Sequence, residues 1–165
     1  MILFFAGLAF AYLVSIYLKQ LNKRRPVHLG IELVGNGIIP KYKTPGAACA
    51  DIYAAGDEHT ILPGSTAKIP TGIKLDIPHG WEVQVRSRSG LASRGIFVAN
   101  QPGCIDSDYK KEIFVLLHNT SMDTFSFSQG TRIAQICLAK TPVMNFVVGQ
   151  VIDNDRGGFG STGFL

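Results

Sequence analysis

The sequence predicts an all-β domain of the sandwich, barrel or jelly-roll kind. Three short runs, rich in β-branched side chains, have the period of strands: residues 72–77, 81–85 and 112–117. Glycine and proline interrupt the chain at close intervals, at residues 63–64, 70–72, 78–80, 102–103 and 129–130. Only residues 89–94 look able to form a helical turn, so this pattern favours a sandwich or barrel over a βαβ fold.

The chain has 165 residues, 46% of them hydrophobic, which is enough for one domain with a substantial core. The clear shift in composition falls at Pro26. We therefore expect three parts: an apolar and basic segment over residues 1–25, the β domain over residues 26–148, and a glycine-rich C-terminal tail over residues 149–165 that closes a site.

Residues 1–18 contain no charged side chain, and as a helix they would extend about 27 Å, close to the roughly 30 Å of a hydrocarbon core. No basic residue precedes this run and four follow it, an order that leaves the C-terminal body in the cytoplasm. We expect an apolar N-terminal helix outside the fold that acts as an uncleaved membrane anchor. A signal-like segment, a helix that packs on a partner and an upstream start site are the alternatives.

The body of the protein is neutral. The segment before Pro26 holds four of the sixteen Lys and Arg residues, which leaves twelve against twelve acidic residues. A neutral body lacks the electrostatic footprint of a nucleic-acid-binding protein. Cys49, Cys104 and Cys137 are odd in number, form no CxxC pair and do not cluster with histidines, which argues for a reducing compartment and against a zinc site.

Three segments carry residues suited to chemistry. Residues 86–92 follow a predicted strand and place arginine and serine before a short helix, as in a phosphate site, although such residues are also commonly just solvated. Residues 100–109 combine an amide, a carboxylate and an aromatic ring that could bind a nucleoside and activate water, or could form a plain polar loop. Residues 157–163 could close over a phosphorylated ligand, or could be a disordered terminus.

Five blocks of the sequence, taken in order, resemble the motifs of the trimeric deoxyuridine triphosphatase (dUTPase) family. They are residues 50–52, 88–92, 100–109, 130–135 and the terminal glycine tail, and the resemblance covers residues 27–165. It implies a dUTPase-like jelly-roll or β-clip barrel and a homotrimer whose sites are shared between subunits. It also implies Mg²⁺-assisted hydrolysis of dUTP to dUMP and pyrophosphate, which lowers dUTP and supplies dUMP for dTTP synthesis.

The resemblance also implies a role for each matching residue. Asp106 would deprotonate the water that attacks the α-phosphate, and Gln135 would contact a phosphate or that water. Asp51 would lie near the metal without holding it directly, because Mg²⁺ prefers phosphate and water oxygens. The remaining positions would bind substrate. The uracil would be bound by Asn100, Gly103, Cys104 and Ile105, the deoxyribose by Tyr109, and the phosphates by Arg88, Ser89 and Gly90. The tail would close over the substrate with Arg156, Phe159, Gly160, Ser161 and Thr162, and Phe159 would stack on the base.

The sequence departs from the family pattern in three places. Lys110-Lys111 stand where the family usually has Arg-Gly after its tyrosine, Arg156 lies directly next to Gly157, and the apolar N-terminal segment is foreign to the fold. Two other functions are alternatives for this sequence. A dCTP deaminase would need a glutamate three residues before Asn119, where this chain has Leu116, and a nucleotide-binding or regulatory module would keep the fold with weak hydrolysis.

Overall fold

The computed structural model describes Tyr12, Val14 and residues 26–152. Within that part, eleven short strands and one helical turn follow Pro26, so the predicted all-β class is confirmed. The elements are β1 (Gly30–Leu33), β2 (Ala50–Tyr53), β3 (Glu58–Ile61), β4 (Thr66–Pro70), β5 (Ile73–Asp76), β6 (Trp81–Arg86), α2 (Ser89–Ala92), β7 (Ile96–Val98), β8 (Gly103–Ile105), β9 (Phe114–Asn119), β10 (Phe125–Ser128) and β11 (Arg132–Lys140).

The three predicted strand runs correspond to β5, β6 and β9, with ends that differ by at most two residues. The predicted helical turn is α2, which is only four residues long. These elements follow from local sequence, because alternation along β6 buries Val83 and Val85 and leaves the residues between them on the opposite face.

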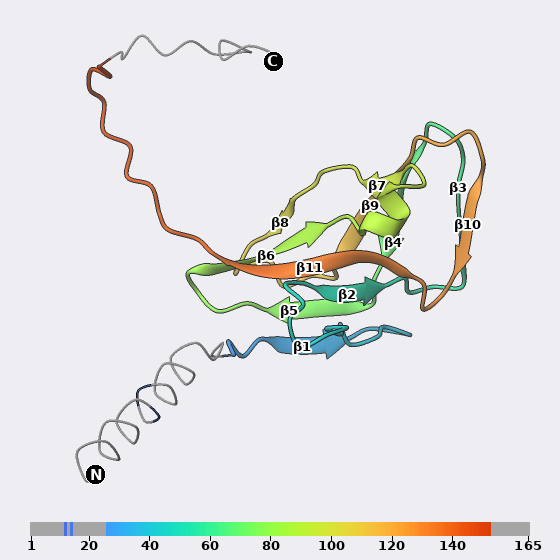
Figure 1. Cartoon of the computed structure of the whole chain (residues 1–165), viewed down its shortest axis with the longest axis horizontal. Coiled ribbons are helices and arrows are strands. Elements are labelled where there is room, and N and C mark those ends of the chain that lie inside the picture. Colours follow the sequence, from blue (N-terminus) through green and yellow to red (C-terminus); the bar gives the residue numbers. More distant parts are fainter. Residues whose placement is uncertain (1–11, 13, 15–25, 153–165) are drawn as a thin grey trace, which may run out of the picture.

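The strands form four antiparallel sheets within the described residues. The largest has the order β2-β11-β6-β8, and the next has the order β4-β9-β7 (Figure 1). Two-stranded sheets pair β1 with β5 and β10 with β3. The core between these sheets includes Ile52, Val115, Leu117 and Ile133, all of them fully buried. Because most neighbours in the sheets are distant in sequence, the fold brings separate motifs side by side.

The turn at residues 70–72 requires its glycine. Gly72 has φ +64°, a conformation that other L-residues rarely adopt. A Cβ atom there would lie 2.5 Å from the Cα atom of Gly37. This turn joins β4 to β5, and Val34 N–H donates to the Gly72 carbonyl at 2.8 Å, which ties the chain after β1 to the same corner.

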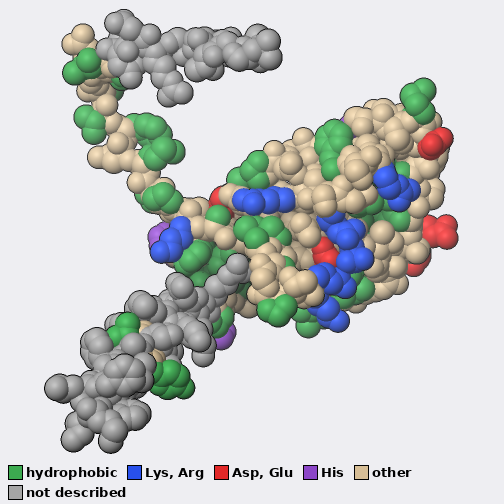
Figure 2. Space-filling view, viewed as in Figure 1, with side chains coloured by type: hydrophobic (Ala, Val, Ile, Leu, Met, Phe, Trp, Pro, Cys, Tyr) green, Lys and Arg blue, Asp and Glu red, His purple; other side chains and the backbone are tan. Residues whose placement is uncertain are grey.

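An extended segment leaves the body after β11. Residues 142–152, here called the arm, have no helix or strand and run away from the sheets (Figure 1). The arm carries large apolar side chains that are 72–104% exposed, and Figure 2 shows them standing away from the body. They are Val143, Met144, Phe146, Val147, Val148, Val151 and Ile152.

Within the residues that the structure describes, no helix has the length and apolar character needed to cross a membrane. The predicted anchor over residues 1–18 lies outside the described residues, except for Tyr12 and Val14, which are helical. The predicted tail residues from Arg156 to Thr162 also lie outside them.

Candidate functional site

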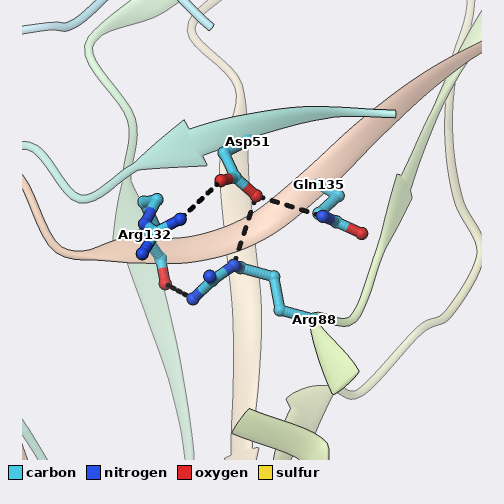
Figure 3. A network of polar contacts seen from close by, with 4 residues as sticks. All are labelled: Asp51, Arg88, Arg132 and Gln135. Atoms are coloured by element: carbon cyan, nitrogen blue, oxygen red, sulfur yellow. Dashed lines mark hydrogen bonds and ion pairs between the residues drawn. The ribbon is translucent and has the colours of Figure 1, made fainter. Parts of the chain in front are cut away.

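Four residues from three separate segments form one polar network around Asp51 (Figure 3). Asp51 lies on β2, Arg88 follows β6, and Arg132 and Gln135 lie on β11. Arg132 Nη1 donates to Asp51 Oδ2 at 3.1 Å, and Gln135 Nε2 donates to Asp51 Oδ1 at 3.1 Å. Arg88 Nε donates to Asp51 Oδ1 at 3.2 Å, and Arg88 Nη1 donates to the Arg132 carbonyl at 2.9 Å.

Strand pairing produces this network. In the β2–β11 ladder Gln135 lies opposite Asp51, and in the β11–β6 ladder it lies opposite Arg86. Residues opposite each other on paired strands share a face of the sheet, so the side chains of Asp51 and Gln135 meet. Arg88 reaches the same carboxylate because the chain turns into α2 just after β6. In the view of Figure 2, basic side chains gather over the part of the molecule that carries β2 and β11.

Asp51 is only 2% exposed and is held as a carboxylate. Burial alone would raise its pKa. The hydrogen bonds from Gln135 and Arg132, together with the charges of Arg88 and Arg132, outweigh burial, so the pKa of Asp51 lies below its usual value. Two guanidinium groups then face one carboxylate, and the network keeps an excess positive charge that favours an anionic ligand.

A pocket of about 280 Å³ contains the predicted nucleoside-binding residues. Its lining includes Asn100, Cys104, Ile105, Asp106 and Tyr109, all of which the sequence placed at one site. The carboxylate of Asp106 is exposed, and Tyr109 is 39% exposed. An amide, an aromatic ring and an accessible carboxylate therefore face one space.

Two hydrogen bonds hold the turn that carries Asp106 and Tyr109. The Tyr109 hydroxyl donates to the Glu112 carbonyl at 2.9 Å, and the Tyr109 N–H donates to the Asp106 carbonyl at 3.2 Å. Lys110, which stands where the family usually has arginine, forms an ion pair with β5, because Lys110 Nζ lies 2.6 Å from Asp76 Oδ1. The turn that carries Asp106 and Tyr109 is thus held by its own backbone and by β5.

Gly103 leaves room for Asn100. A Cβ atom at Gly103 would lie 3.0 Å from Asn100 Nδ2, tighter than ordinary van der Waals contact. Gly103 pairs with Val85 at the start of β8, directly after the turn that holds Asn100. The glycine thus sets the position of the Asn100 amide at the edge of the pocket.

A groove of about 480 Å³ is lined by three arginines, namely Arg88, Arg94 and Arg132. Ser126, Ser128 and Thr131 add hydroxyl groups to it. Arginine and hydroxyl donors in one concave space are suited to phosphate. The groove therefore fits the anionic part of a nucleotide, and the predicted phosphate residues Ser89 and Gly90 lie nearby on α2 with exposed positions.

Sequence reasoning missed several of these residues. Lys68, Phe114 and Leu116 also line the 280 Å³ pocket, because β4 pairs with β9 and places Lys68 opposite Leu116. Arg94 and Arg132 line the arginine groove without having been assigned a role. A single basic residue after a helical turn is a weak signal, and only the fold shows that Arg94 and Arg132 converge.

The predicted site residues do not all meet in one cavity. Asn100, Asp106 and Tyr109 line one pocket, whereas Arg88 lines the arginine groove. Arg88, expected to bind phosphate, has Nε and Nη1 engaged with Asp51 and the Arg132 carbonyl. Arg88 therefore holds the polar network together, and its guanidinium group lies at the edge of the groove.

Asp51 does not fit as a direct magnesium ligand in this arrangement. Both of its oxygens accept hydrogen bonds from nitrogen donors, and two of those donors are cations. Over residues 26–152, together with Tyr12 and Val14, no group of three or more His, Cys, Asp or Glu side chains could hold a metal ion.

The fold and these two cavities define a class: an all-β protein that binds a phosphorylated nucleoside. Comparison with protein families gives the particular family. The dUTPase family model matches residues 35–163, so the chain belongs to the dUTPase family.

Relatives and solved structures agree with that assignment. A deoxyuridine 5'-triphosphate nucleotidohydrolase of Chlamydia pneumoniae is 51% identical over 138 residues, which cover 80% of this chain and 95% of the relative. The enzyme of the same name from Rhizobium johnstonii is 46% identical over 139 residues, covering 78% and 88%. The dUTPase of Staphylococcus bacteriophage 80alpha with dUpNHpp superposes with a TM-score of 0.72 at 23% identity, covering 84% of this chain and 99% of that structure.

Proposed function

We propose that this protein is a dUTP diphosphatase, which hydrolyses dUTP to dUMP and pyrophosphate. The observation that carries the proposal is the pocket in which Asn100, Asp106 and Tyr109 meet in a member of the dUTPase family. The bacteriophage 80alpha dUTPase was solved with dUpNHpp bound, which supports a deoxyuridine nucleotide as the substrate of this protein. The reaction lowers dUTP and supplies dUMP.

Base and sugar recognition falls to the 280 Å³ pocket. The Asn100 amide offers both a donor and an acceptor, which suits the polar edge of a uracil ring. Gly103 keeps that amide in place, and the Tyr109 ring offers a flat face for the deoxyribose. A ring packed against the sugar leaves little room for a 2′-hydroxyl, so the pocket selects deoxynucleotides.

Asp106 is the proposed general base. It is exposed within the pocket, so a water molecule can reach its carboxylate. Asp106 accepts a proton from that water as the water oxygen attacks the α-phosphorus. The bond from the α-phosphorus to the bridging oxygen breaks, and pyrophosphate leaves with that oxygen.

The network around Asp51 holds the phosphate-binding groups in place. Asp51 fixes Arg88 and Arg132, and both arginines line the groove that we assign to the phosphates. Gln135, which lies on β11 opposite Asp51, would contact a phosphate or the attacking water. Phosphate and water oxygens would hold Mg²⁺, which would neutralise phosphate charge when bound. A neighbour structure of the phage phi11 dUTPase describes the coordination of a structural Mg(II) ion.

A homotrimer accounts for the separation of the two cavities and for the arm. Neighbouring subunits would bring the pocket of one chain to the groove of another, and the tail with Phe159, Gly160, Ser161 and Thr162 would close over the site. The exposed apolar arm supports this assembly, as does a groove of about 900 Å³ lined by apolar residues such as Leu29, Trp81 and Ile136. Large apolar surfaces of this kind commonly mark interfaces.

Deamination of dCTP has no support in this arrangement. Leu116 lines the pocket at the place where a deaminase would need its glutamate, and a leucine side chain cannot transfer protons. A purely regulatory role has no observation in its favour either.

Membrane attachment through residues 1–18, with a cytoplasmic catalytic domain, stays a prediction. A reporter fused to residues 1–25 is expected in the membrane fraction. A reporter recovered wholly in the soluble fraction would contradict the anchor.

Turnover of dUTP with Mg²⁺, followed by release of pyrophosphate, tests the function. Wild-type protein is expected to hydrolyse dUTP and to leave dTTP, dCTP and UTP largely untouched. Asp106→Asn is expected to bind dUTP with little change in Kd and to lose activity by about 10²-fold or more, the usual scale for general-base catalysis. Unchanged turnover in this variant would remove Asp106 from the mechanism.

A further inference from the structure

Cys137 and Cys104 lie in one row across the four-stranded sheet, and Cys49 directly precedes β2 at the edge of the same sheet. The β11–β6 ladder places Cys137 opposite Gln84, and the β6–β8 ladder places Gln84 opposite Cys104. On the other side of β11, Ile136 lies opposite Ala50. Continuing that register by one residue sets Cys49 opposite Cys137.

The thiols of Cys49 and Cys137 interact. Burial and then the neighbouring Cys137 thiol raise the pKa of Cys49, and the positive charge of Arg86 opposes them. Both cysteines are partly buried, and both are free thiols. Cys137 lies on β11 and Cys49 directly precedes β2, so the pairing of these two strands holds the cysteines near each other.

The spacing of such a pair fits a disulfide. Directly opposed residues in an antiparallel ladder have Cα atoms about 4.5 to 5.5 Å apart, and disulfides join Cα atoms about 4.4 to 6.8 Å apart. Cys104 is two strands away from Cys137, with Gln84 between them, which corresponds to about 10 Å. Cys104 thus lies in the same row but beyond bonding distance.

We propose that Cys49 and Cys137 form an oxidisable thiol pair, which hydrogen peroxide converts to an intramolecular disulfide. The sulfur of one thiolate attacks a peroxide oxygen, the O–O bond breaks, and the leaving oxygen departs as water with the thiol's proton. The resulting sulfenic acid is attacked by the second sulfur, its S–O bond breaks, and a second water leaves. The two thiols lose two hydrogen atoms while the peroxide is reduced to two waters.

The bridge would join β2 to β11 in the row next to Asp51 and Gln135. Cys49 is two residues from Asp51, and Cys137 is two residues from Gln135, on the same face of the sheet. The disulfide would therefore fix the pair of strands that carries the polar network. This modification requires no nucleotide, so it is separable from dUTP hydrolysis.

The full chain treated with hydrogen peroxide tests the proposal. After blocking with N-ethylmaleimide and proteolysis, mass spectrometry is expected to find the Cys49 and Cys137 peptides joined, with Cys104 alkylated. Dithiothreitol is expected to release the two peptides. Joined peptides that contain Cys104, or a treated protein with Cys49 and Cys137 both alkylated, would overturn the pairing.

A second readout is thermal unfolding. The oxidised wild-type chain is expected to show a higher Tm than the reduced chain, because a cross-link restricts the unfolded state. Cys137→Ser is the matched variant: its Tm should not rise with peroxide, whereas the Tm of Cys104→Ser should rise as in the wild type. A rise that persists in Cys137→Ser would assign the effect to another site.

Discussion

Gln135 lies directly opposite Asp51 in the β2–β11 ladder and donates its side-chain amide to the buried carboxylate at 3.1 Å. The contact joins two motifs that are far apart in sequence. It also places the only amide of the network on the side of Asp51 that faces away from Arg132 (Figure 3). Stability of the domain and geometry of the phosphate groove therefore depend on the same carboxylate.

Removing the Asp51 carboxylate is expected to destabilise the domain. Asp51→Ala leaves Arg88 and Arg132, which are 22% and 40% exposed, without their buried partner. The cost is expected to lie below the about 3–5 kcal/mol of breaking a fully buried ion pair and above that of a surface pair, because water solvates both arginines in part. Urea unfolding of Asp51→Ala and wild type measures the difference. Glu32→Gln is the control, because Glu32 pairs with Lys74 on the surface at 2.8 Å, with side chains 66% and 34% exposed, and such pairs contribute about 0–1 kcal/mol. Equal losses in the two variants would contradict the role of burial.

The same carboxylate gives the stability a pH dependence. The pKa of Asp51 is lower in the folded protein than in the unfolded chain, where it is about 3.9. The contribution of Asp51 is therefore complete above about pH 5 and is lost as the pH falls through the folded pKa. The free energy of unfolding of wild type minus that of Asp51→Asn should be constant near neutral pH and should shrink below about pH 4. A free-energy difference that grows on acidification would contradict the lowered pKa of Asp51.

Much of the fold is predictable from the sequence, because β5, β6 and β9 follow from alternation and from their flanking turns. That Asn100, Asp106 and Tyr109 line one pocket was also predictable, since they lie within ten residues of one another, and their binding of a nucleoside stays a prediction. The partners of Asp51 were not. They depend on strand register between distant segments, and a register shift between Arg132 and Ala134 helps both Arg132 and Gln135 to reach one carboxylate.

Gly103→Ala is expected to weaken dUTP binding. The added methyl group would lie 3.0 Å from Asn100 Nδ2 and would displace the amide by a few tenths of an ångström. Since small displacements of binding groups lower catalytic efficiency sharply, we expect kcat/KM to fall by about tenfold, mainly through KM. Gly46→Ala is the control, because a Cβ atom there meets nothing within 4 Å. Steady-state kinetics on dUTP should separate the two variants, and identical KM values would remove the steric argument.

The arm offers a test of assembly. Phe146 and Val147 are 84% and 81% exposed in a segment without secondary structure, and apolar side chains of this size are stabilised when a partner covers them. If the proposed trimer depends on the arm, Phe146→Asp with Val147→Asp is expected to give species smaller than a trimer in sedimentation experiments at micromolar concentration, and to lower dUTP turnover with it. Met122→Asp is the matched control, because Met122 is 91% exposed on the loop between β9 and β10 and lies outside the arm. A trimer that survives the double substitution, or one that Met122→Asp also dissociates, would show that the arm is not the element that joins the subunits.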